Sequence, residues 1–264
     1  MNHKFNFMNH KFLYVGPSWA RLSYDTKYGD EKTSTNLLKL WKLTNNAVDL
    51  SKKGAGPKGV LKLLQVYNKW RGNVNWNNNK EQKLNLPIIY VACEPLKDME
   101  KVEKVDKKNK HRKNYKVDHN YDYIAHEKDI MKFRKQLLKS VYKKLNLLGV
   151  RIGIIGAHTD CENEENIYEN ITVLDRSWQN FLAREAGISE RKYNWGAEVF
   201  HRHIRHSSNN PIDRQTVIDV DNQFKFWREL EDAKLMCWCH PTTLANKLYA
   251  EYTYNKVIDF IKEY

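Results

Sequence analysis

Two short segments near opposite ends of the chain carry residue types that could form a nucleophile and its base. Gly16-Pro17-Ser18-Trp19 follows an apolar run, and His240-Pro241-Thr242 precedes an amphipathic segment. A serine hydroxyl is a poor nucleophile until a base removes its proton, and a neutral imidazole is suited to that task near neutral pH. We therefore take Ser18 and His240 as candidate catalytic residues. Both also have a structural interpretation, Ser18 as a turn or cap residue and His240 as a cap of the last helix.

Acyl transfer also needs donors for a developing oxyanion, and a glycine-containing loop could supply one of them. Lys53-Gly54-Ala55-Gly56-Pro57 follows a second short apolar run. The amide of Ser18 is another candidate donor, and the family resemblance described below implies that the amide of Gly54 or Gly56 completes the oxyanion hole.

Other polar residues follow the remaining apolar runs or stand next to His240. Because ligands bind beyond the carboxyl ends of parallel strands, we expect these residues to line the same pocket. They are Glu94, His158, Asp160 and Cys237, together with Asp175 and Trp178, which follow the last apolar run.

Two clusters of histidine and cysteine raise the question of a metal. Cys237-Trp238-Cys239-His240 has no second ligand pair of the kind that structural zinc sites use. His201, His203 and His206 lie in a basic, polar segment, typical of a solvated loop or of a site for an anionic group. We expect neither a metal nor a cofactor.

The elements that must position these residues follow from the alternation of the chain. Short apolar runs occur at 12–15, 47–50, 86–92, 150–155 and 171–174, and helix-like segments occur near 34–41, 57–70, 129–145, 177–184, 211–235 and from 241 onward. Strands alternating with helices predict an α/β fold in which a parallel sheet is covered on both faces. A polar, basic insertion at about 97–126 interrupts this pattern within a single domain of residues 1–264.

Composition limits the class of protein. The 264 residues are 41% hydrophobic and include eight Trp, which is enough for a sizeable core. No apolar run reaches the roughly 18 residues of a membrane span, so we expect no membrane insertion. Four Cys are too few for a disulfide framework, and the start of the chain lacks a signal-peptide pattern. These features predict a cytoplasmic protein.

The net charge of +13 leaves a nucleic-acid or anionic-surface partner open as an alternative. Much of the excess lies in residues 97–116, which by default form a solvated loop. No RNP, helix-turn-helix or zinc-finger pattern accompanies it. If this segment did bind nucleic acid, the affinity would fall steeply with salt.

The order of these motifs resembles that of the SGNH (GDSL-type) hydrolase family. The serine after the first strand, the glycine after the second and the His-Pro-Thr before the last helix correspond in order and spacing. The resemblance implies a three-layer, flavodoxin-like fold with about five parallel strands and helices on both faces. It also implies an esterase or carbohydrate O-deacetylase that acts on an acylated small molecule or glycan.

Two positions depart from the family pattern. Cys237 stands where the family has the aspartate that orients the histidine, and Glu94 stands near the family's oxyanion-hole asparagine. In a serine protease, neutralising the third triad member costs about 10⁴ in rate. A Ser18–His240 dyad, with a backbone carbonyl orienting the imidazole, is one alternative. The other is an inactive member of the fold with a structural or binding role and protein partners in an assembly. Because the chain is also similar to uncharacterised marine-bacteriophage proteins, that role could lie in a virion.

Overall fold

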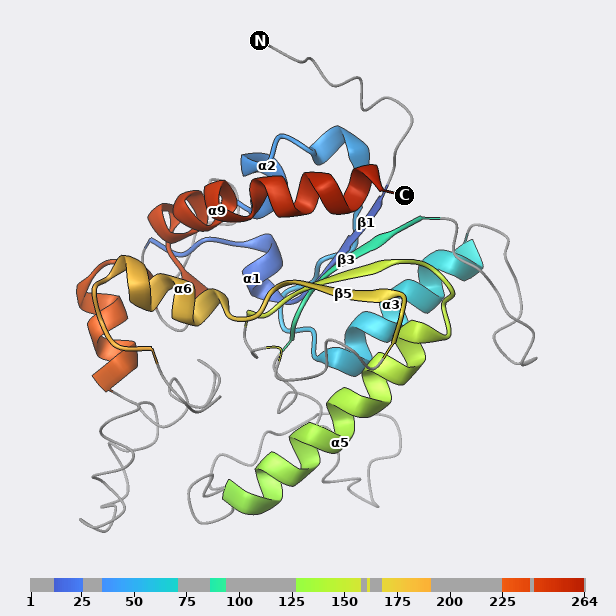
Figure 1. The fold of residues 1–264 in the computed structure, drawn as a ribbon, viewed down its shortest axis with the longest axis horizontal. Helices are drawn as coiled ribbons and strands as arrows, with labels where there is room; N and C mark the ends of the chain where they lie inside the picture. Colours follow the sequence, from blue (N-terminus) through green and yellow to red (C-terminus); the bar gives the residue numbers. More distant parts are fainter. Residues whose placement is uncertain are drawn as a thin grey trace, which may run out of the picture.

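A sheet of five parallel strands forms the centre of the molecule (Figure 1). The computed structural model describes residues 12–25, 35–70, 86–93, 127–157, 161, 168–190, 225–237 and 240–263, with the backbone alone at 68–70 and 127–134. The strands are β1 (Phe12–Val15), β2 (Ala47–Asp49), β3 (Ile88–Val91), β4 (Ile152–Ile155) and β5 (Ile171–Asp175). Their order, β2-β1-β3-β4-β5, is the flavodoxin-like order. The prediction of a three-layer α/β fold is confirmed.

The strands are apolar throughout because both faces of the sheet are buried. Along β1, Phe12 and Tyr14 belong to the core on one face, and Leu13 and Val15 belong to the core on the other. All four are fully buried. The sheet therefore separates two hydrophobic cores.

Helices cover both faces (Figure 1). The core that contains Leu13 is closed by α3 (Pro57–Trp70) and α5 (Glu127–Asn146). The core that contains Phe12 is closed by α1 (Ser18–Arg21), α2 (Leu37–Leu40), α6 (Trp178–Glu185), α9 (Thr243–Lys262) and a helical segment at 225–232. Among the helices that the structure describes, none is both long and apolar enough to cross a membrane.

Local signals fix several helix starts. Pro57 is the first residue of α3, as its fixed φ and missing N–H favour. The side chain of Asn36 accepts a hydrogen bond from the amide of Lys39 at the start of α2. The side chain of Ser177 does the same for the amide of Asn180 at the start of α6.

The structure corrects the prediction for the C-terminal region. The predicted helix at 211–235 is helical at 225–232, and residues 211–224 lie outside the described part of the chain. Between this helix and α9, β6 (Met236–Cys237) and β7 (His240–Pro241) form an antiparallel pair that the sequence did not predict. The last helix begins at Thr243, because Pro241 belongs to β7.

Several predicted features lie outside the described residues. They are Glu94, His158, Asp160, Cys239, the histidines at 201–206 and the basic insertion at 97–126.

Candidate active site

Ser18 and His240 are brought together by the fold. The His240 Nε2 and Ser18 Oγ atoms lie 2.8 Å apart, although the residues are 222 positions apart in the chain. Ser18 is only 1% exposed, and His240 is partly buried. At this distance an unprotonated Nε2 accepts a hydrogen bond from the Ser18 hydroxyl, which is the geometry that activates a serine.

Gly16 allows Ser18 to follow the sheet directly. A Cβ at position 16 would lie 2.7 Å from the Cβ of Ala20 and 2.8 Å from that of Val91, so only glycine fits between β3 and α1. The chain therefore turns at Gly16-Pro17, and Ser18 is the first residue of α1. Pro17 is the N-cap residue of α1 and makes no side-chain cap hydrogen bond, so Ser18 is not the N-cap residue.

The far end of α1 is held to the strand that precedes it. The hydroxyl of Tyr14 donates a hydrogen bond of 3.0 Å to the carbonyl of Ala20. Tyr14 is fully buried, and burial, with Asp49 nearby, raises the pKa of its phenol well above the usual value. The phenol therefore remains a donor at neutral pH, and α1 is anchored behind Ser18.

His240 is placed by β7 and by the first turn of α9. The Thr242 hydroxyl accepts from the amide of Ala245 and donates to the carbonyl of Lys234. Thr242 is thus the N-cap of α9, and His240 is not, which removes the structural interpretation of His240 as a helix cap. The histidine belongs to β7, and its Nε2 contacts Ser18 Oγ.

Cys237 lies directly opposite His240 in the β6–β7 pair. Residues directly opposite in an antiparallel pair place their side chains on one face, with Cβ atoms about 4.5–5.5 Å apart. Burial raises the pKa of the Cys237 thiol, and the nearby carboxylates of Glu231 and Asp25 raise it further. The thiol is therefore neutral at pH 7 and supplies no negative charge to the imidazole.

Tyr24, which the sequence analysis did not single out, is in direct contact with His240. The two rings are stacked with centroids 4.1 Å apart and planes inclined by 30°. The ammonium group of Lys53, from the loop after β2, lies 5.7 Å from the centroid of the Tyr24 ring. No local sequence signal marks this contact, since it joins segments more than two hundred residues apart.

The glycine loop after β2 adjoins the end of β1. The amide of Lys52 donates to the carbonyl of Gly16 over 3.0 Å, which fixes the loop next to the turn that carries Ser18. Gly54 is exposed with φ +72°, and Gly56 is buried with its carbonyl accepting the amide of Val60 in α3. An oxyanion-hole role for either amide stays a prediction.

A cavity of about 380 Å³ lies beyond β5, lined by residues of α6 and α9. Asp175 is among its lining residues, but this carboxylate is 8% exposed and accepts hydrogen bonds from Tyr249 and Tyr252. Trp178 is fully buried and stacks on Tyr249 with centroids 4.2 Å apart. The contacts of both residues join β5 and α6 to α9, and the lining of this cavity includes neither Ser18 nor His240.

The two histidine and cysteine clusters lie wholly or partly outside the described residues, since 201–206 and Cys239 are not described. Within the described part of the chain, no three His, Cys, Asp or Glu side chains gather as a metal site would require.

Comparison with known proteins does not identify a relative. No protein-family model matches the chain, and no curated protein or solved structure gives a significant match. The geometry around Ser18 and His240 is therefore the basis on which a function can be proposed.

Proposed function

We propose that this protein is a serine hydrolase of acyl esters, an esterase or a carbohydrate O-deacetylase, with Ser18 as nucleophile and His240 as general base. The observation that carries the proposal is the 2.8 Å contact between Nε2 and Oγ at the carboxyl end of β1. This is the edge of an open parallel sheet at which ligands bind.

The reaction would proceed in two halves. Ser18 Oγ attacks the ester carbonyl carbon while His240 Nε2 takes the hydroxyl proton, and a tetrahedral oxyanion forms. The C–O bond to the alcohol breaks as His240 returns the proton to the leaving oxygen, which leaves an acyl group on Ser18. Water then attacks this acyl group while His240 takes its proton, the bond between the acyl carbon and Oγ breaks, and His240 returns the proton to Oγ as the carboxylic acid is released.

The environment of His240 predicts a slow enzyme. An imidazolium forms in both halves, and the neutral Cys237 thiol cannot stabilise it as a carboxylate would. In a serine protease, neutralising that position lowers the rate by about 10⁴. Reactive esters and phosphonates should therefore react more readily than unactivated glycan acetates.

The experiment is intact-mass labelling with a small fluorophosphonate, in which Ser18 Oγ displaces fluoride. The wild-type protein should gain one phosphonyl group, and Ser18→Ala and His240→Ala should gain none. Ser140→Ala, at an exposed serine on α5, is the matched control and should label as the wild type does. A wild-type protein that stays unmodified overturns the proposal. If the wild type is labelled and both variants are not, acetylated glycans and short esters would be screened for turnover.

A second candidate is an inactive protein of this fold with a binding or structural role. Two observations favour it, the 1% exposure of Ser18 and the neutral thiol at position 237. Complete absence of labelling in a folded wild-type protein supports this candidate. Turnover that disappears in Ser18→Ala excludes it.

A further inference from the structure

The imidazole of His240 is held by an aromatic ring. Tyr24 stacks on it at 4.1 Å, and Tyr24 is itself only 6% exposed. A buried ring cannot move aside without disturbing the core, so it restricts the imidazole to rotamers that keep the stack. In the observed rotamer Nε2 is directed at Ser18 Oγ.

The segment that carries Tyr24 is hydrogen-bonded to Pro241 and Thr243, which follow His240 in the chain. The amide of Tyr24 donates to the carbonyl of Pro241 over 3.0 Å. The carboxylate of Asp25 accepts from both the amide and the hydroxyl of Thr243, at 2.8 and 2.5 Å. These bonds join the backbone that carries Tyr24 to the backbone that follows His240.

Ionisable side chains surround the stacked rings of Tyr24 and His240. Asp25 carries a negative charge near Cys237, Lys53 lies over the Tyr24 ring, and the Cys237 thiol is neutral. The face of an aromatic ring attracts a cation, so Tyr24 also favours the imidazolium that forms during acyl transfer.

We propose that Tyr24 is the positioning residue of the site, holding the His240 imidazole toward Ser18, and that the hydrogen bonds between Asp25 and Thr243 hold Tyr24 in place. This proposal rests on the proposed function of Ser18 and His240. In this proposal Tyr24 and Asp25 orient the His240 imidazole, which a carboxylate at position 237 would otherwise do.

The test combines a rate with a spectrum in the full-length protein. The rate is that of fluorophosphonate labelling, and the spectrum is the ¹H–¹³C NMR signal of the His240 ring, identified by its loss in His240→Gln. A ring stacked at this distance shifts the imidazole protons upfield. Tyr24→Leu should slow labelling about tenfold or more and remove the upfield shift, whereas Tyr24→Phe should keep the shift and label within about threefold of the wild type.

Two variants of Asp25 distinguish the effect of its hydrogen bonds to Thr243 from the effect of its negative charge. Asp25→Asn keeps an acceptor for the Thr243 amide and should label within about threefold of the wild type, while Asp25→Ala should slow labelling about as much as Tyr24→Leu. Equal losses in Asp25→Asn and Asp25→Ala would instead show that the charge is what matters, which overturns the anchoring role. Thermal unfolding checks that each variant is folded.

The outcomes distinguish this proposal from the proposed function. A labelled wild type with unchanged rate and unchanged His240 signal in Tyr24→Leu overturns the positioning role and leaves the hydrolase intact. An unlabelled wild type overturns the hydrolase, and the NMR signal then decides the positioning role by itself. A His240 signal that moves in Tyr24→Leu and stays in Tyr24→Phe supports the role, and a signal that stays in both overturns it.

Discussion

At the scale of single residues, Gly16 determines where the Ser18 hydroxyl lies. In Gly16→Ala, the new Cβ would lie within 2.8 Å of two other Cβ atoms, so α1 must shift or β3 must give way. We expect a loss of about 1–3 kcal/mol in the free energy of unfolding, measured by urea titration, together with slower labelling of Ser18. Gly59→Ala is the control, because its Cβ would meet nothing closer than 3.6 Å and alanine is favoured in a helix. Equal stability of Gly16→Ala and Gly59→Ala would contradict the steric account.

The Cys237 thiol gives a pH-dependent prediction at the same scale. Its pKa is raised in the folded protein, so the reactive thiolate should appear at higher pH than in the unfolded chain. The pH of half-maximal alkylation by iodoacetamide, read by mass spectrometry at the Cys237 peptide, should therefore be higher in buffer than in urea. By linkage, the neutral thiol stabilises the fold below the unfolded pKa, and this contribution is lost as the pH rises through the folded one. A midpoint at or below that of the unfolded chain would mean that Cys237 can be an anionic partner for His240.

At the scale of elements, the junction of β5, α6 and α9 depends on one buried carboxylate. Asp175 accepts hydrogen bonds from the hydroxyls of Tyr249 at 2.6 Å and Tyr252 at 3.3 Å, and Lys256 Nζ lies 3.7 Å from it. Burial and the neighbouring Asp175 charge raise the pKa of the Tyr249 phenol well above its usual value, so the phenol stays a donor. Asp175→Ala should lower the free energy of unfolding by about 2–4 kcal/mol, because it leaves a buried hydroxyl without its acceptor.

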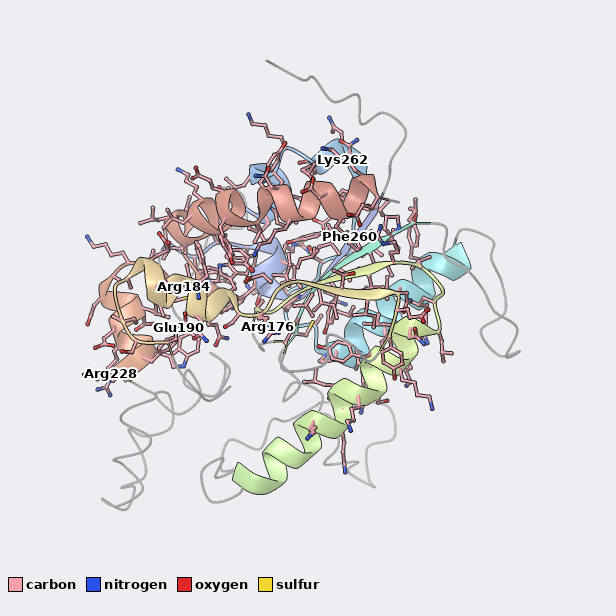
Figure 2. The ribbon with its side chains drawn as sticks, viewed as in Figure 1. Arg176, Arg184, Glu190, Arg228, Phe260 and Lys262 are labelled. Atoms are coloured by element: carbon pink, nitrogen blue, oxygen red, sulfur yellow. The ribbon has the colours of Figure 1, made fainter. Side chains whose placement is uncertain are left out.

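The control for this junction is an ion pair at its surface. Arg184 and Glu190 lie close together beside α6 (Figure 2), with a contact of 2.6 Å between groups that are about half exposed. Glu190→Gln should change the free energy of unfolding by less than about 1 kcal/mol, since solvent screens the pair. Chemical denaturation compares the two variants, and a larger loss in Glu190→Gln than in Asp175→Ala would contradict this ranking.

The elements that could be predicted from sequence are those whose signals are local. Apolar runs mark all five strands, because a parallel strand is buried on both faces, and Asn36, Pro57 and Ser177 mark helix starts through hydrogen bonds or geometry within one turn. The β6–β7 pair has two residues in each strand, too few for any periodicity. The stack of Tyr24 on His240 could not be predicted, since residues so far apart in the chain meet only through the tertiary fold.

At the scale of the whole molecule, the candidate site exists only when the two ends of the described chain are together. Ser18 depends on β1 and α1, and His240 depends on β7 and the start of α9. The indole of Trp41, next to α2, donates to the carbonyl of Ala250 in α9 over 3.1 Å, so the N-terminal elements are joined directly to the last helix. The site is therefore a product of global folding and not of one local motif.

This dependence predicts that labelling of Ser18 and the global unfolding transition coincide. Trp19, Trp41, Trp178 and Trp227 are all buried, so their fluorescence reports loss of the core. In a two-state domain, the urea midpoint for loss of fluorophosphonate labelling should equal the midpoint from tryptophan fluorescence. The far-UV circular dichroism transition is the control for cooperativity. Labelling that disappears at clearly lower urea would show that the contact between Ser18 and His240 opens before the core, with α9 or the segment around Tyr24 separating first.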